Sequence, residues 1–288
     1  MRVMVVGATG AIGTRLIPQL RQAGHSVVGT SRSPARAEGL AALGADPLVL
    51  DALDAGAAHD AVATARPDAI VYQATGLAGV RIGRSLDRAF AATNRLRTEG
   101  VDNLLAGARR AGVGRFVAQS FAPYRYAREG AWVKTEEDGL DPSPPRPARQ
   151  TFAAMDHLDR VVTDAGGIAL RYGGFYGPGD EGLPRSVRDR RTPLVGDGSG
   201  VMSFVHLDDA AAATVAALDR DGPAVYNVVD DEPAPMRDWL PALARALGAK
   251  PPRRVPFWVA RLVAGEGLVM MTEARGASNA KAKADLAW

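Results

Sequence analysis

The stretch Gly7-Ala8-Thr9-Gly10-Ala11-Ile12-Gly13 constrains this chain more than any other. It follows directly on the β-branched run RVMVV and opens a segment whose apolar residues recur on one helical face. The first glycine permits a tight turn, the second lets the backbone approach a pyrophosphate, and the third allows a helix to pack closely on a strand. A pyrophosphate would lie at the helix N-terminus, where free N–H groups and the helix dipole favour an anion. The stretch therefore predicts a dinucleotide-binding βαβ unit.

Strands and helices alternate after this unit, and no hairpin signals interrupt them. The predicted strands are 2–6, 25–31, 47–50, 68–73, 114–120 and 167–172, and one long helix is predicted over 86–111. Such alternation predicts an α/β fold, a Rossmann-type doubly wound parallel sheet.

The domain organisation follows from where this alternation loosens. Residues 1–172 are predicted to form an NADP-binding Rossmann domain, to which segments around 203–229 return as a helix and a strand. Residues 173–202 and 230–288, rich in glycine and proline, are predicted to form a small, mostly helical substrate-binding lobe.

Composition excludes several classes of protein. The chain has no cysteine, so disulfides and thiolate metal sites are excluded, and no metal is expected. Its longest apolar stretch, 210–218, is far too short to span a membrane. The net charge is only +3, and the arginine clusters at 185–191 and 253–254 lack interleaved aromatic residues for stacking bases. We therefore expect a cytoplasmic protein, monomer or homodimer, that binds neither nucleic acid nor a membrane.

The end of the second strand selects the form of the cofactor. An acidic residue there would bind a ribose 2′-hydroxyl and favour NAD, but this chain has Thr30, Ser31 and Arg32. A hydroxyl and a guanidinium suit a 2′-phosphate, because arginine offers a bidentate fork to phosphate oxygens. The sequence therefore predicts NADP(H). Asp51, after the third strand, is placed to meet the adenine edge or to cap a helix.

Several longer motifs resemble those of the extended and atypical short-chain dehydrogenase/reductases, the group that contains sugar-nucleotide epimerases. They include TNRLRTEGVDNLL, LRYGGFYGPGD, SFVHLDDAAAA and VYNVVDDEP, and the resemblance runs nearly end to end. The resemblance implies a nicotinamide cofactor. The residues that it assigns to this cofactor are Gly7, Thr9, Gly10, Ala11, Ile12, Gly13, Ser31, Arg32, Asp51, Ala52, Gln73, Ala74, Thr75, Asn94, Tyr172, Gly173, Gly174 and Phe175.

The chain departs from that family where proton transfer is expected. The family's catalytic tyrosine and lysine stand four residues apart on one helix, and the resemblance places Thr151 and Met155 at these positions. Threonine does not ionise usefully near neutral pH, and methionine carries no proton. The family's catalytic serine or threonine falls on Ser120 or on Phe121, depending on the alignment. Tyr124 or Tyr126 would be a substitute acid, as would Ser120.

The resulting hypothesis is an enzyme, an NADPH-dependent ketoreductase acting on an aromatic polyketide-like ketone. It resembles the angucyclinone-type ketoreductases that lack the usual triad, as in simocyclinone biosynthesis. A phenol beside the carbonyl would supply the proton, because the cofactor itself carries the hydride chemistry. The expected substrate contacts are Phe121, Thr151, Met155 and Met202. Two alternatives stay open, a non-catalytic NADP(H)-sensing regulatory protein and a sugar-nucleotide epimerase or dehydratase.

Overall fold

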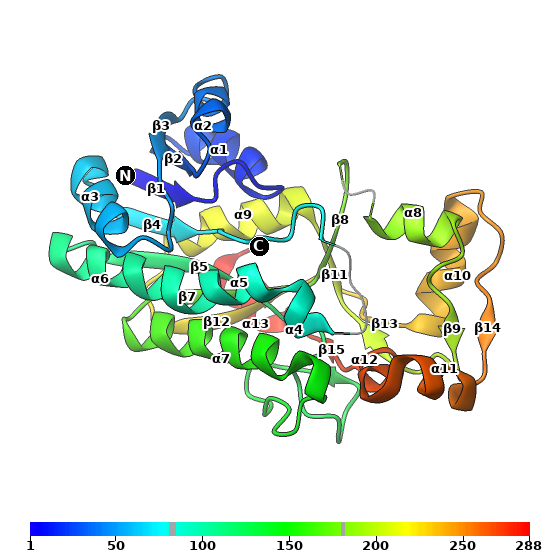
Figure 1. Cartoon of the computed structure of the whole chain (residues 1–288). Helices are drawn as coiled ribbons and strands as arrows, with labels where there is room; N and C mark the ends of the chain where they lie inside the picture. Colours follow the sequence, from blue (N-terminus) through cyan, green and yellow to red (C-terminus); the bar gives the residue numbers. More distant parts are fainter. Residues whose placement is uncertain (81–84, 180–181) are drawn as a thin grey trace.

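A seven-stranded parallel sheet forms the centre of the computed structural model, which describes residues 1–80, 85–179 and 182–288 (Figure 1). In sheet order the strands are β12 (Ala224–Val228), β7 (Ile168–Tyr172), β5 (Arg115–Phe121), β4 (Ala69–Tyr72), β1 (Arg2–Val6), β2 (Ser26–Ser31) and β3 (Asp46–Val49). The order reverses at β1, from which the chain steps outward in both directions. The predicted Rossmann-type sheet is confirmed.

Helices cover both faces of this sheet, because alternate residues of each buried strand point to opposite sides. On β1, Val3 and Val5 join the core under α1 (Gly13–Gln22) and α9 (Leu207–Ala217). Met4 and Val6 join the other core, under three helices. These are α3 (Ala55–Ala65), α6 (Val101–Ala111) and α7 (Arg149–Asp164). The short α2 (Pro34–Ala41) connects β2 to β3.

The single helix predicted over 86–111 is confirmed over 91–111, where the chain is continuously helical, but Phe90 interrupts the segment. It consists of α4 (Leu86–Ala89), α5 (Ala91–Arg95), a π-helical turn η1 (Leu96–Gly100) and α6. Within the wide turn, the Leu96 carbonyl accepts a hydrogen bond from the Tyr72 hydroxyl at 2.7 Å. A Cβ at Gly100 would lie 2.5 Å from that hydroxyl oxygen, so glycine is needed there. Tertiary contacts of this kind are invisible to helical periodicity.

The remaining elements form a smaller lobe beside the carboxyl ends of the strands (Figure 1). Its helices are α8 (Gly182–Arg188), α10 (Met236–Ala246), α11 (Phe257–Ala264) and α12 (Val269–Thr272), with 3₁₀ turns at Arg146–Ala148 and Gly265–Leu268. The predicted glycine-rich loops contain short strands that pair with distant segments. The pairs are β8 (Gly174–Tyr176) with β11 (Phe204–His206), β9 (Leu194–Val195) with β14 (Arg254–Val255), β10 (Val201–Met202) with β13 (Ala234–Pro235), and β6 (Val133–Lys134) with β15 (Gly276–Ala277).

The last helix, α13 (Ala280–Leu286), leaves the lobe and packs against β12 and α9. Across the described residues, every helix is too short or too polar to serve as a membrane span.

Candidate functional site

A cleft of about 1080 Å³ opens at the carboxyl ends of the parallel strands. Residues that follow β1, β2, β4 and β7 line it, together with the end of β5. This is the edge at which ligands bind in open α/β sheets.

The glycine loop forms one end of the cleft, and its geometry explains two of its glycines. Gly7 has φ +88°, and a Cβ there would lie 2.8 Å from the backbone carbonyl of Gln73. A Cβ at Gly13 would lie 2.5 Å from the carbonyl oxygen of Ala8, so the helix could not pack so closely. Thr9, Gly10, Ala11 and Ile12 also line the cleft.

Arg15 lines the cleft two residues after this loop, and the sequence interpretation missed it. Its guanidinium is held by the Asp208 carboxylate at 3.0 Å and by the carbonyls of Ala11 and Pro178. Its place in the first turn of the helix that follows the glycines is the signal that would have found it.

Two arginines flank the end of β2, where Thr30 and Ser31 also line the cleft. Both Arg32 and Arg36 are exposed. In the described part of the chain neither guanidinium has a hydrogen-bond or ion-pair partner. Arg36 was missed, although it lies one helical turn beyond Arg32.

The predicted adenine contact at Asp51 falls outside the cleft lining, whereas its neighbour Ala52 lies within it. The exposed Asp51 carboxylate accepts a hydrogen bond from the Leu53 amide at 3.0 Å. Asp51 does not cap the following helix either, because Asp54 accepts from the Ala57 amide at that position.

The middle of the cleft contains Gln73, Ala74 and Thr75, as predicted from the resemblance. The other three residues assigned to the cofactor, Asn94, Tyr172 and Gly173, are buried and do not line the cleft. Tyr172 is fully buried and its hydroxyl lies 2.5 Å from that of Thr214. Asn94 donates a hydrogen bond to the Thr151 hydroxyl at 3.1 Å.

The far end of the cleft is bordered by Gly174, Phe175, Gln119 and Phe121. Strand alternation explains this set, since Gln119 and Phe121 share one face of β5 and Ser120 points to the other. Ser120 is fully buried and accepts a hydrogen bond from Arg125 at 3.0 Å. The structure thus does not bring Ser120 to the cleft, and Gln119, which was missed, is there instead.

The two positions that the resemblance assigns to the catalytic tyrosine and lysine are closed to solvent. Thr151 is 1% exposed and Met155 is 2% exposed. Met155 packs in an apolar cluster with Phe152 and Ala148, against which Phe121 and Tyr124 also pack. Neither Thr151 nor Met155 lines the cleft, and neither does Met202, so these three expected substrate contacts are not at its surface. Phe121 does line it, and Phe121 with the buried Met155 cluster behind it is here called the apolar wall. Met202 is half-buried, on β10, and borders Gly174.

The two candidate tyrosines lie in different surroundings. Tyr124 has φ +69°, a strained conformation for a residue with a side chain. Its ring packs at a tilt on Phe121, with ring centroids 6.5 Å apart, and burial raises its pKa to about 12. The Tyr126 hydroxyl instead donates to Asn227 Oδ1 at 2.6 Å inside the protein. Neither tyrosine lines the cleft, and both line a small separate pocket. Tyr124 packs on the cleft-lining Phe121, whereas the Tyr126 hydroxyl is bound to Asn227.

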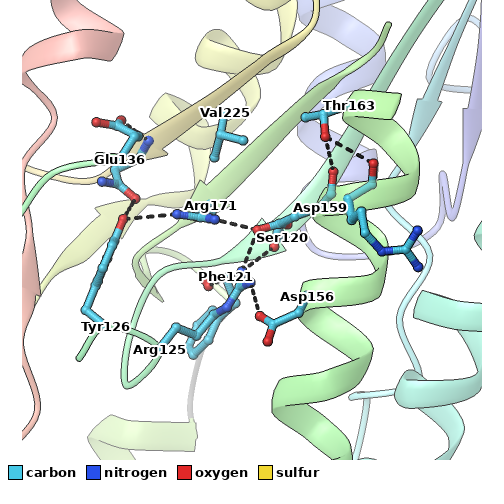
Figure 2. Close-up of polar contacts among 12 residues, drawn as sticks. Ser120, Phe121, Arg125, Tyr126, Glu136, Asp156, Asp159, Thr163, Arg171 and Val225 are labelled. Carbon is cyan, nitrogen blue, oxygen red and sulfur yellow. Dashed lines mark hydrogen bonds and ion pairs between the residues drawn. The ribbon is translucent and has the colours of Figure 1, made fainter. Parts of the chain in front are cut away.

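A charged cluster next to β5 is made of the buried Arg125, Asp159 and Arg171 and the half-exposed Asp156 (Figure 2). Arg125 pairs with Asp156 at 2.6 Å and with Asp159 at 2.9 Å, and Arg171 pairs with Asp159 at 2.8 Å. Burial alone would raise the pKa of Asp159, but Arg125 and Arg171 outweigh it and the pKa lies below the usual value. The cluster ties the end of β5 to α7 and β7.

The described residues contain no group of three or more His, Cys, Asp or Glu side chains that could hold a metal ion.

Comparison with known families and proteins agrees with the fold. The family model described as the NAD dependent epimerase/dehydratase family matches residues 3–228. A 3-diazoavenalumate denitrifying reductase from a Streptomyces species is 43% identical over 100% of this chain and 95% of its own length.

More distant relatives include another reductase and an epimerase. A ketoreductase of a farnesylated dihydroquinoline oxide from Stigmatella aurantiaca is 28% identical over 93% of this chain and 80% of its own length. Among solved structures, UDP-glucose 4-epimerase of Thermotoga maritima superposes with a TM-score of 0.75 at 19% identity, covering 100% of this chain and 93% of the other. A likeness at that identity concerns the fold alone.

Proposed function

The chain belongs to the NAD-dependent epimerase/dehydratase family, and on that premise we propose that it is an NADPH-dependent reductase of aromatic small molecules. Its reductase relatives already support a nicotinamide-dependent oxidoreductase with a small-molecule substrate. The preference for NADPH, the aromatic substrate and the source of the proton are the parts that we propose.

The residues of the cleft suit a phosphorylated dinucleotide. Gly7 and Gly13 let the loop backbone pack tightly on Gln73 and Ala8. The loop also lines the cleft, where its backbone would bind a pyrophosphate. The unpaired guanidinium groups of Arg32 and Arg36 stand where a 2′-phosphate would need cations, and no carboxylate follows Ser31 to repel it. When bound, the nicotinamide supplies a hydride.

The apolar wall carries the proposal about the proton. Thr151 and Met155 are buried, and Phe121 stands at the end of β5 where a hydroxyl would be expected. Hydride transfer needs only alignment from such a wall, but the negative charge that results must be held somewhere. We infer that the substrate holds it, on an oxygen conjugated with its aromatic ring.

A hydroxyaryl diazo compound is the first substrate class that fits, and the relative with 43% identity favours it. In its neutral diazo-oxide form, the carbon that bears nitrogen gains the hydride. The C–N bond breaks and its electron pair leaves with dinitrogen. The ring oxygen is left as a phenolate, which later takes a proton from water, and no protein acid is needed.

An aromatic ketone with a neighbouring phenol is the second class, and the ketoreductase relative favours it. The carbonyl carbon gains the hydride, the phenol proton moves to the new alkoxide, and a resonance-stabilised phenolate remains. An angucyclinone-like polyketide has this arrangement, and the flat Phe121 and Phe175 rings suit it.

Isotope transfer tests the proposal. The protein would be incubated with NADPH deuterated at the transferable position, with diazo-oxides and with pairs of polycyclic ketones whose phenol is free or methylated. We expect deuterium on carbon in the diazo-oxide or free-phenol products and none in the methylated ketones. Label in the methylated ketones would assign the acid to the protein, with Tyr124 as the candidate beside the wall.

Two other outcomes correspond to other functions. Tight NADPH binding with no label in any product would favour an NADP(H) sensor. Interconversion of UDP-sugars would favour an epimerase, although the family's tyrosine base has no counterpart at Thr151.

A further inference from the structure

Arg97 is a buried cation without a partner. It belongs to the π-helical turn η1, and only 4% of its surface is exposed. Across the described residues its guanidinium makes no hydrogen bond or ion pair, and its Nη1 is inaccessible and unsatisfied. Buried arginines are ordinarily paired, because desolvating a charge is costly.

The charges around Arg97 do not neutralise it. Burial and, next, the like charge of Arg125 lower its pKa to about 10, while Asp159 acts in the opposite direction. The charged cluster of Figure 2 already uses both of its carboxylates, Asp156 and Asp159, on Arg125 and Arg171. With Arg97 added, three arginines face two carboxylates. With a pKa of about 10, Arg97 therefore stays a cation at neutral pH, and neither of these two carboxylates pairs with it.

The turn that carries this charge reaches the cleft, although Arg97 itself does not line it. Leu96, the residue before Arg97, lines the cleft, and so does Phe121, whose carbonyl accepts from Arg125 at 3.3 Å. A fixed charge in a poorly polarisable interior acts on the cleft more strongly than it would through water.

We propose that Arg97 supplies the positive potential that stabilises an oxyanion formed on the substrate in the cleft. This rests on the proposed function. Arg97 does not touch the reacting atoms, and it acts across the wall as a fixed charge. Its ligand class is an aromatic phenolate, the species that both substrate classes leave behind.

A bound phenol reports the potential without any turnover. The probe is 5-hydroxy-1,4-naphthoquinone, whose phenolate absorbs visible light, titrated in the complex with NADP⁺, which cannot reduce it. The chain has no thiol to react with the quinone. We expect the native protein to lower the pKa of the phenol below its free value. R97M should raise the pKa of the bound phenol by about one unit, and R97K should leave it near the native value.

Stability provides a second readout that needs no ligand. R97M removes an uncompensated buried charge and fills its space, so its melting temperature should rise. The matched variant R125M takes one of two arginine partners from the buried Asp159 and leaves Asp156 unpaired, so its melting temperature should fall.

An unchanged phenol pKa in R97M, a loss of stability in R97M, or failure of the native protein to bind the probe or lower its pKa would each overturn the proposal. Because the titration involves no hydride, a native protein that shifts the probe yet transfers no deuterium would refute the reductase and leave the electrostatic role standing.

Discussion

At the scale of single residues, Thr151 and Met155 are two side chains that cannot donate a proton, so in the proposed reaction the substrate itself would supply it. The Thr151 hydroxyl is occupied by the Asn94 amide, and Met155 fills an apolar cluster. Both side chains therefore serve packing. Around them the cleft keeps the glycine loop and the backbone approaches that a dinucleotide needs.

Arg32 provides a residue-level prediction about the cofactor. R32A should weaken NADPH binding about tenfold, because one charge-assisted contact to the 2′-phosphate is lost. NADH lacks that phosphate, so its dissociation constant should not change. Quenching of protein fluorescence measures both constants. R36A, at the second arginine of the cleft lining, is the matched variant for comparison. If R32A weakened NADPH and NADH binding equally, the assignment of Arg32 to the 2′-phosphate would be contradicted.

At the scale of elements, the buried charged cluster joins β5, α7 and β7 through Arg125, Asp159 and Arg171. The arrangement holds the end of β5, and with it Phe121, at the border of the cleft. It also explains why Ser120 faces inward, since its hydroxyl accepts one of the Arg125 hydrogen bonds.

Asp159 makes this joint sensitive to acid. Its folded pKa lies below the ordinary aspartate value of about 3.9, so its contribution is fully present above that value. The contribution should be lost as the pH falls below about 4 through the folded pKa. D159N should cost about 3–5 kcal/mol at neutral pH, because two buried arginines lose a partner.

Urea unfolding of the native protein and of D159N between about pH 6 and 3 measures this effect. The native stability should decline more steeply in acid than that of D159N. Parallel declines would show that the acid sensitivity arises elsewhere.

Much of the element pattern was predictable from the sequence, because buried parallel strands are continuous apolar runs. The glycine loop was predictable from its motif, and the cleft residues after β2 and β4 from their place at strand ends and from the family resemblance. The π-helical turn at Leu96–Gly100 was not predictable, since its Leu96 carbonyl is bound by the hydroxyl of Tyr72 from a distant strand. Arg97 was equally hidden, because nothing local in TNRLRTEG distinguishes a buried arginine from an exposed one.

At the scale of the whole molecule, the chain does not end in the lobe to which its last segment was assigned. The helix α13 returns to β12 and α9, and Leu286 is 5% exposed in the same core as β1. The helix α13 therefore packs on the central sheet beside its outermost strand, β12.

Leu286 carries the prediction at this scale. L286A should lower the free energy of unfolding by about 2–4 kcal/mol, because it leaves a cavity in the main core. L262A on α11, where the side chain is 79% exposed, should change it by less than about 0.5 kcal/mol. Denaturant unfolding measures both. Equal effects would mean that α13 is not part of the folding unit.

In the proposed reductase the apolar wall has one more consequence, which concerns regiochemistry. A polycyclic molecule often carries several carbonyl groups of similar reactivity, and an enzyme with its own acid distinguishes them by how the molecule docks. A wall without an acid adds a criterion that belongs to the substrate, since only the position with an adjoining ring oxygen can complete the reaction. The substrate's own ring oxygen would then decide in part which carbonyl is reduced. A cleft that does not fix the substrate's orientation tightly would still yield a single product.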